Sequence, residues 1–439
     1  MAEPGAEVSL THRRVLSIAL PVVISNATVP LLGAVNTGVI GQMGQAAPIG
    51  AVGLGAVILA SIYWVFSFLR MGTSGLVAQA RGAGDGREAG AHLVRALLIG
   101  LAAGLVLVLG QGLILGGALR LAPASAQVED LARQYLSIRI WGAPATISLY
   151  ALTGWLIAVE RTRALLVLQL LMNGLNVALD LWFVLGLDWG VPGVAAATLI
   201  AEWSGLALGL WLARHAIARG LRHAQLFAAD RLRRLGQVNG DIMIRSVLLQ
   251  GCFTSFMFLA AGQGDVTLAA NQVLLQFLEI LSFALDGFAF AAESLVGQAV
   301  GARHPARLRR AAALASGWGF GGAAALALAY GLFGGALIDL LTTSTEVRDE
   351  ARRYLPWLVA LPLVSVAAYM LDGIFIGATR TREMRNAMIL TVAVYAALVL
   401  ALLPVFGNHG LWVALTVLNC LRGLTLWRLF PQVEAAARA

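Results

Sequence analysis

The sequence LVAQARGA at residues 76–83 returns as LVGQAVGA at residues 295–302, a spacing of 219 residues. Arg161 and Arg380 keep the same spacing. This recurrence predicts two copies of one structural unit within the chain. Duplicated halves in an apolar sequence are typical of membrane transporters, in which the substrate cavity lies between the two repeats.

We predict three regions from the repeat and the charge distribution. Residues 1–213 are expected to form an N-terminal six-helix lobe, and residues 240–439 a C-terminal six-helix lobe. Residues 214–239 are rich in arginine and are expected to form a cytoplasmic linker between the lobes. Basic side chains in such a connector favour a surface that faces lipid headgroups. A specific lipid-binding or regulatory site in the linker is the alternative.

The composition predicts a protein embedded in a lipid bilayer. Of the 439 residues, 59% are hydrophobic and 12% are charged. A soluble protein carries about 25% charged residues. Apolar segments of about 20 residues, long enough to cross a bilayer, recur along the chain. We therefore predict an all-α membrane protein with twelve transmembrane helices in two pseudo-symmetric lobes around a central cavity. The expected spans are residues 13–40, 49–80, 90–118, 128–159, 164–186, 191–214, 240–262, 267–301, 307–335, 346–378, 383–406 and 409–430.

Basic residues indicate the orientation of the chain. All 31 are arginines, and most fall at the termini and in the even-numbered connections between spans. Cytoplasmic loops of membrane proteins carry an excess of basic residues, so this pattern predicts that both termini are cytoplasmic. The net charge of +8 is dispersed among short loops, which argues against nucleic acid as a partner.

No enzyme signature is present in the sequence. Cys252 and Cys420 are far apart, and the six histidines form no metal-spaced pair. There is no P-loop, which argues against direct coupling to ATP. We therefore expect no catalytic residue, no metal site and no cofactor.

Acidic residues inside the predicted spans are the best candidates for function. A charge at the centre of a membrane helix costs about 2.5–3.5 kcal/mol on insertion scales, so each acid needs a partner, water or a proton. Several of these acids have neutral residues at the equivalent place in the other repeat, which favours function over packing. The intramembrane acids are Asp180, Glu202, Glu279, Asp286, Glu293 and Asp372.

The fifth predicted span contains a compact polar pair. Asn176 and Asp180 are four residues apart and share a helix face. Apolar surroundings disfavour the charged form of a carboxyl group, so Asp180 is expected to exchange protons near neutrality. The alternative is a hydrogen bond that only joins neighbouring spans.

The remaining acids are secondary candidates. Glu279, Asp286 and Glu293 recur every seven residues, so they form one stripe on the eighth span, about 10 Å apart. Glu293 is the nearest of these to the cytoplasmic end, where a loop arginine is an alternative partner. Asp372 lies in the middle of the tenth span. Two roles are equally compatible with Glu202, a residue of the site or a member of a structural ion pair. The candidate counter-ions of Glu202 and of the other acids are Arg70, Arg245 and Arg422.

Several motifs resemble the multidrug and toxic compound extrusion (MATE) family, within the wider MOP flippase-like fold and closest to its DinF-type branch. The resemblance runs from about residue 11 to residue 430. The matching segments are ALP at 19–21, PLLGAVNTGVIG at 30–41, FLRMGTSGL at 68–76, DGFAFAAE at 286–293 and LDGIFIGATR at 371–380.

The resemblance implies a secondary transporter that works by alternating access. It implies export of hydrophobic or cationic drugs and toxic compounds across the bacterial inner membrane, driven by a cation that is usually the proton. It also implies a monomer. The family's polar site in the N-terminal lobe maps onto Asn36, Asn176, Asp180 and Thr198. Pro21 matches a proline at which the first helix is reported to bend in some members.

Two departures from the family pattern bear on coupling. Asn36 stands where the family usually has an aspartate, and an amide cannot take up a proton at neutral pH. A transport-impaired protein is therefore one alternative. The interior of the seventh span carries Arg245 and Gln250, whereas sodium-coupled relatives of a different branch have an acid in this span, which makes sodium the less favoured ion.

Two rival functions are also compatible with the sequence. A lipid-linked oligosaccharide flippase of the same fold would use arginines to hold a pyrophosphate, with Arg70, Arg245 and Arg422 as candidates. A membrane scaffold without transport is the other rival, and the buried acids argue against it.

Overall fold

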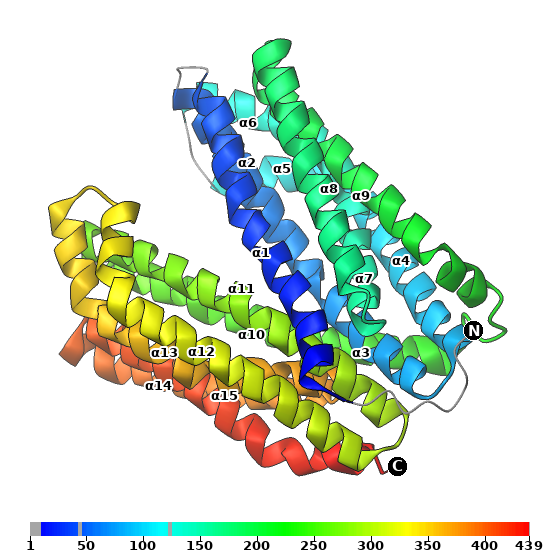
Figure 1. Ribbon diagram of the computed structural model, residues 1–439. Helices are drawn as coiled ribbons and strands as arrows, with labels where there is room; N and C mark the ends of the chain where they lie inside the picture. Colours follow the sequence, from blue (N-terminus) through cyan, green and yellow to red (C-terminus); the bar gives the residue numbers. More distant parts are fainter. Residues whose placement is uncertain (1–9, 43–45, 122–124, 439) are drawn as a thin grey trace. The chain divides into compact units, whose positions relative to one another are not determined.

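The computed structural model describes residues 10–42, 46–121 and 125–438, and all regular elements in these residues are helices (Figure 1). The elements are α1 (His12–Gly41), α2 (Ala46–Trp64), η1 (Val65–Ser67), α3 (Phe68–Gly82), α4 (Gly86–Leu109), α5 (Gln111–Leu121), α6 (Ala126–Arg139), η2 (Ile140–Gly142), α7 (Ala143–Ala158), α8 (Thr162–Asp180), η3 (Leu181–Gly186), α9 (Gly190–Leu221), α10 (Ala229–Ala261), α11 (Asp265–Gly301), α12 (Pro305–Leu341), α13 (Thr345–Gly377), α14 (Thr381–Phe406) and α15 (Asn408–Ala436).

The helices match the predicted membrane spans well. Within the described residues, 11 helical segments are long and apolar enough to cross a membrane. The 30-residue helix α1 precedes them and corresponds to the first predicted span. The third predicted span, 90–118, is interrupted: α4 ends at Leu109, Gly110 follows, and α5 begins at Gln111. The all-helical fold is confirmed, but the third predicted span consists of two helices instead of one.

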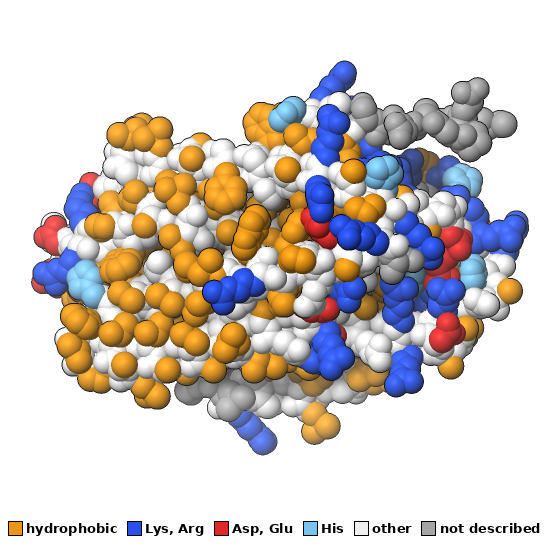
Figure 2. Space-filling model, turned by 90° about the horizontal axis from the view of Figure 1, so that it is seen from below, with side chains coloured by type: hydrophobic (Ala, Val, Ile, Leu, Met, Phe, Trp, Pro, Cys, Tyr) orange, Lys and Arg blue, Asp and Glu red, His pale blue; other side chains and the backbone are white. Residues whose placement is uncertain are grey.

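The outer surface is unusually apolar for a folded protein. Hydrophobic side chains dominate large areas of the surface visible in Figure 2. On α4, Leu105, Val106 and Leu109 are all exposed, as are Leu328 and Leu332 on α12. Water would disfavour such a surface, whereas lipid tails accept it. The helices are therefore those of a multi-pass membrane protein.

The chain divides into two compact units. Unit 2 contains residues Ile24–Val77 and Asp85–Asn239, and unit 1 contains the remaining described residues. In unit 2, α4 packs against α7 and α9, and α8 packs against α9. In unit 1, α11 packs against α12 and α13, and α15 packs against α13 and α14. Unit 2 takes in the linker region 214–239, and unit 1 takes in the start of α1, up to Val23.

Small residues allow the close helix contacts inside each unit. Gly104 of α4 lies directly against the backbone of Pro144 and Ala143, where α7 begins. Gly90 of α4 lies against the backbone of Gly220 of α9 in the same manner. A side chain at either position would push the helices apart. Close backbone approach of this kind is a common source of helix association in membranes.

Replacing Gly104 with Ala is expected to destabilise the protein by about 1–3 kcal/mol, because the added methyl group overlaps the backbone of α7. Gly174→Ala is the matched control, since nothing lies within 4 Å of the position where its methyl group would sit. Thermal unfolding in detergent should show a lower midpoint for Gly104→Ala alone. Equal midpoints would show that the two helices can separate without loss of stability.

Both ends of the described chain contact the first half of α12. The indole of Trp318 donates to Nδ1 of His12 at 3.1 Å, at the start of α1. Arg309 pairs with Glu434 near the end of α15, with a nitrogen–oxygen distance of 2.6 Å. The two ends of the described chain therefore lie at the same end of unit 1.

Candidate functional site

Three helices of unit 2 bring the predicted polar residues together. Asp180 is the last residue of α8, and its exposed fraction is 0%. Asn176 lies one turn earlier on the same face and is also buried. Asn36 comes from α1, and Thr198 comes from α9. The structure therefore places all four of these residues in one site.

Hydrogen bonds link the four side chains. Asn176 donates from Nδ2 to the hydroxyl oxygen of Thr198 at 3.0 Å, and that hydroxyl donates to the carbonyl oxygen of Val194 at 3.0 Å. The network assigns the amide nitrogen of Asn36 to the side that faces Asp180, since this orientation satisfies its partners. The nitrogen then donates to Oδ2 of Asp180 at 2.9 Å and to the carbonyl of Leu32 at 3.1 Å.

The backbone changes its winding directly after Asp180. Residues Leu181–Gly186 form a π-helical segment, and the amide of Leu187 donates to the carbonyl of Trp182, five residues earlier, at 2.9 Å. The chain then turns through Asp188, with φ of 56°, before α9 begins at Gly190. Short π-helical segments inside membrane or soluble helices frequently mark functional sites. Nothing in the sequence predicted this segment.

The site contains a buried carboxylate that forms no ion pair with any residue that the structure describes. Oδ1 of Asp180 is buried and has no hydrogen-bond partner among the residues that the structure describes. Its other oxygen accepts a hydrogen bond from the neutral amide of Asn36, its one partner within the described part of the chain. A buried carboxylate in this situation is unstable unless it binds a proton or a cation. The amide of Asn36 also donates to Oδ1 of Asn176, whose own amide nitrogen donates to Thr198, so these side chains continue the network.

A second acid of unit 2 is already neutralised by an arginine. Glu202 and Arg139 form a two-pronged ion pair, with nitrogen–oxygen distances of 2.6 and 2.9 Å. Gly142 leaves room for it, because a side chain there would overlap the carboxylate of Glu202. Arg70, Arg245 and Arg422 were candidate counter-ions of Glu202 or of other acids, and for Glu202 this was wrong, because its partner is Arg139 from the end of α6.

In unit 1, Asp372 of α13 accepts from two arginines. Arg245 of α10 and Arg422 of α15 both donate to its Oδ2, the second at 2.6 Å. Arg422 also donates to Oδ1 of Asn419 at 3.0 Å. Two of the three arginines that a pyrophosphate site would require therefore meet at one carboxylate, while Arg70 belongs to unit 2.

The acid stripe of the eighth span lies on one unbroken helix, α11. Its members nevertheless have different surroundings: Glu279 is exposed, Asp286 is half-buried and Glu293 is buried. The seven-residue spacing predicted a common face, but a helix of 37 residues passes several environments along that face. The described part of the chain contains no group of three or more His, Cys, Asp or Glu side chains suited to a metal ion.

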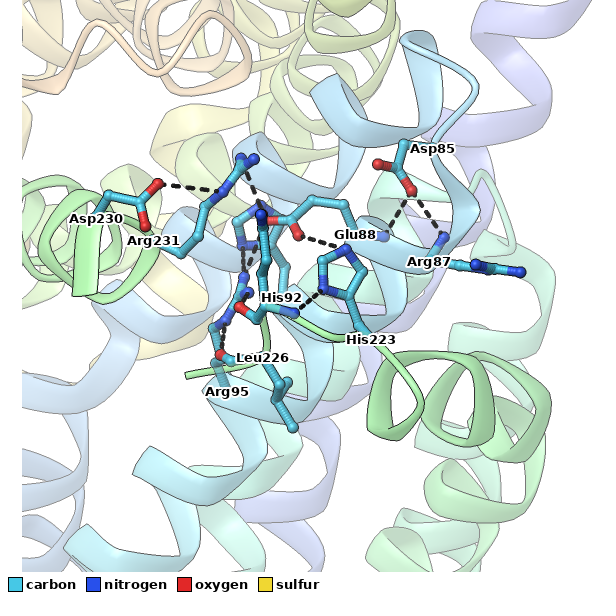
Figure 3. A network of polar contacts seen from close by, with 10 residues as sticks. Asp85, Arg87, Glu88, His92, Arg95, His223, Leu226, Asp230 and Arg231 are labelled. Atoms are coloured by element: carbon cyan, nitrogen blue, oxygen red, sulfur yellow. Dashed lines mark hydrogen bonds and ion pairs between the residues drawn. The ribbon is translucent and has the colours of Figure 1, made fainter. Parts of the chain in front are cut away.

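Sequence reasoning missed a polar network between α4 and the linker (Figure 3). Glu88 accepts from Arg95 at 3.0 Å and lies 3.1 Å from His92 and 3.4 Å from His223. Arg95 also donates to the carbonyls of residues 225 and 226 in the linker. The network therefore fixes the linker to unit 2. Its only local signal is the spacing of Glu88, His92 and Arg95, which places them on one face of α4.

Comparison with known proteins identifies the family. The profile of the MatE family matches residues 21–182 and again residues 242–403, which together make up most of the chain. The chain is a member of the MatE family. The double match agrees with the internal repeat. Members of this multidrug and toxic compound extrusion family are secondary transporters and not enzymes.

The relatives cover nearly the whole chain. DNA damage-inducible protein F of Escherichia coli (strain K12) is 44% identical over 420 residues, which cover 94% of this chain and 91% of that protein. A probable multidrug resistance protein NorM of Rhodopseudomonas palustris is 29% identical, over 94% of this chain and 90% of that protein. The 44% identity to DNA damage-inducible protein F confirms the DinF-type resemblance.

Solved structures confirm the fold. The outward-facing conformation of a multidrug resistance MATE family transporter matches with a TM-score of 0.87 at 19% identity, over 98% of this chain and 97% of that chain. The Vibrio cholerae MATE transporter VcmN in its bent form matches with a TM-score of 0.85 at 22% identity, over 97% of each chain. This MatE-family chain therefore has the fold of the MATE transporters.

Proposed function

We propose that this MatE-family protein is a proton-coupled antiporter that exports hydrophobic or cationic compounds across the bacterial cytoplasmic membrane. In this proposal Asp180 binds the coupling proton, and Asn36, Asn176 and Thr198 set its hydrogen bonding. The substrate leaves the cell as the proton enters, by alternating access. Each charge that crosses the membrane contributes about 2.3 kcal/mol per 100 mV to this work.

A contrast between three buried acids carries the proposal. Glu202 pairs with Arg139, and Asp372 pairs with two arginines, so these carboxylates already have cations. Asp180 makes no ion pair with any described residue, although it is the most deeply buried of the three. A carboxylate without a fixed counter-ion gains the most from binding a mobile one.

Proton binding at Asp180 would change the hydrogen bonds of α1. The charged carboxylate accepts from the amide nitrogen of Asn36. A protonated carboxyl group donates a hydrogen bond instead. Asn36 can accept this hydrogen bond through its amide oxygen if the side-chain amide rotates by about 180°. The turn breaks the hydrogen bond from Asn36 to the carbonyl of Leu32. Protonation is thereby linked to the part of α1 that follows Pro21.

The proposed orientation places both termini in the cytoplasm. Support comes from the shared position of both chain ends beside α12 and from the arginine bias of the loops. Localisation to the inner membrane and a monomeric state are parts of the same proposal. The relative of E. coli is a bacterial protein, which is consistent with this location.

Reconstituted vesicles can separate the two candidate ions. We expect a pH gradient, imposed without sodium, to drive uptake of ethidium into vesicles that contain the protein. An equal sodium gradient at constant pH should give uptake no faster than protein-free vesicles. Uptake that responds only to sodium would overturn the choice of proton, and uptake with neither gradient would overturn the antiport.

Asn36→Asp tests whether the amide impairs the native protein. We expect ethidium efflux to change by no more than about twofold, because Asp180 already supplies a proton site and Asn36 a hydrogen-bond partner. Asn36→Leu, which removes that partner, is expected to lower the rate by about tenfold, equal to about 1.4 kcal/mol. A gain of tenfold or more in Asn36→Asp would show that the native chain is impaired.

A further inference from the structure

Arginines outnumber acids at one end of unit 2. Gly90 of α4 lies against Gly220 of α9. Arg161, at the turn from α7 to α8, donates to the carbonyl of Leu212 in α9 at 3.3 Å. Three segments therefore meet at this end, and together they contain ten arginines and four acids: residues 85–95, 160–163 and 214–239. Even with every acid paired to one arginine, six guanidinium groups have no carboxylate in these segments.

Several of these arginines are directly accessible. Arg219, Arg222 and Arg233 are exposed and form no ion pair with any residue that the structure describes. Glu88, the buried acid of this region, is already shared within the network of Figure 3, where Arg231 lies 3.7 Å from it. The surplus charge of this end of unit 2 is therefore at the surface, where an external anion can reach it.

Large apolar side chains are exposed between the arginines. Leu221, Phe227 and Leu232 are 60%, 65% and 41% exposed. Leu221 directly precedes Arg222, and Leu232 directly precedes Arg233. Amphipathic surfaces that combine arginines with Leu and Phe lie at the boundary between lipid headgroups and acyl chains. A soluble acidic partner would leave the apolar side chains without a function.

Contacts with α4 hold this surface in place. Arg95 donates to the carbonyls of Gln225 and Leu226, at 3.0 and 2.6 Å. The side chain of Leu226 is buried in a cluster that includes Ala91 of α4. Because Leu226 is fixed on the inner side of the linker, the neighbouring Phe227 is kept at the outer surface. The linker therefore presents its arginines and its aromatic ring without an ordering cost on binding.

We propose that this linker surface binds anionic phospholipids. Its members are Arg219, Leu221, Arg222, Phe227 and Arg233. The guanidinium groups bind the phosphate, for which their paired N–H donors are suited, and the apolar side chains contact the upper part of the acyl chains. A basic connector needs only to lie near headgroups, whereas this surface selects lipids with a net negative charge over zwitterionic ones.

Two lipids with the same acyl chains test the preference. Native mass spectrometry of the purified full-length protein, released from detergent, resolves lipid-bound forms by their mass. Dioleoyl phosphatidylglycerol and dioleoyl phosphatidylcholine are titrated separately. We expect phosphatidylglycerol to bind about tenfold more tightly, since each basic side chain near an anionic surface contributes a factor of about five. Equal affinities would overturn the inference.

Paired variants distinguish a site from a general effect of charge. Arg222→Gln combined with Arg233→Gln should weaken binding of phosphatidylglycerol by about tenfold or more and leave phosphatidylcholine nearly unchanged. Arg13→Gln combined with Arg310→Gln is the matched control, because it removes two exposed arginines from unit 1. An equal loss in both double variants would mean that only net charge matters, which would contradict the assignment of the linker surface.

Phe227→Ser tests the apolar part of the surface. The variant should weaken both lipids by a similar factor, because contact with acyl chains does not depend on the headgroup. Unchanged affinities for both lipids would refute the role given to this side chain. These measurements need no transport, so their outcome is independent of the proposed antiport.

Competition identifies the source of the anion. Glycerol 1-phosphate carries the phosphate without acyl chains and should not displace phosphatidylglycerol from the protein at equal concentration. Displacement would show that a free phosphate is the ligand. Displacement by hexaglutamate would show that an acidic protein segment fits the surface better, and either result would overturn the choice of a lipid.

Discussion

Asp180→Asn is expected to abolish proton-driven export. The variant keeps the shape of the side chain and removes the only group of the site that can bind a proton. Ethidium resistance of cells that express Asp180→Asn should fall to that of cells with empty vector, and efflux driven by a pH gradient should fall by at least about tenfold.

Asp188→Asn is the matched control for this prediction. Asp188 is exposed and lies eight residues further along the chain, with φ of 56°. Asparagine tolerates such a positive φ well, so the substitution should fold and transport normally. Resistance in Asp180→Asn equal to that of the parent, at equal amounts of protein in the membrane, would refute the role given to Asp180.

Glu202→Gln is expected to have the largest effect on stability. The change leaves Arg139 as a buried cation without its carboxylate, which typically costs about 3–5 kcal/mol. Thermal unfolding in detergent should show a large drop in the midpoint. The double variant Arg139→Met with Glu202→Leu should recover most of this loss, because both charges are then removed together.

Glu129→Gln serves as the control for the ion-pair prediction. Glu129 pairs with Arg133 at 3.1 Å, but both side chains are exposed to a large extent. Exposed ion pairs contribute about 0–1 kcal/mol, so this variant should unfold close to the parent. If the thermal unfolding midpoint of Glu202→Gln were also close to that of the parent, the ion pair with Arg139 would not contribute to stability.

Sequence reasoning succeeded where it depended on local spacing. Asn176 and Asp180 lie on one face of α8 because four residues make about one helical turn. The repeat and the length of apolar segments were sufficient for the helical fold and most span positions. The positions of Asn36 and Thr198 in the site came from the family resemblance, since they lie on other helices.

Contacts between residues that are far apart in the sequence could not be predicted. Arg139 and Glu202 are 63 residues apart, and no sequence pattern indicates that α6 and α9 meet there. Arg245 and Arg422 were named as candidate counter-ions, but the sequence did not indicate that both would pair with Asp372, because they lie on α10 and α15. The π-helical segment after Asp180 depends on local backbone geometry that apolar residues alone do not specify.

The most direct test of the account measures proton movement itself. Pyranine trapped inside proteoliposomes reports the internal pH while ethidium is added outside in the absence of sodium. We predict a proton flux opposite to the ethidium flux for the parent and for Asp188→Asn, and none above protein-free vesicles for Asp180→Asn. An undiminished proton counterflow in Asp180→Asn would contradict the assignment of the coupling site.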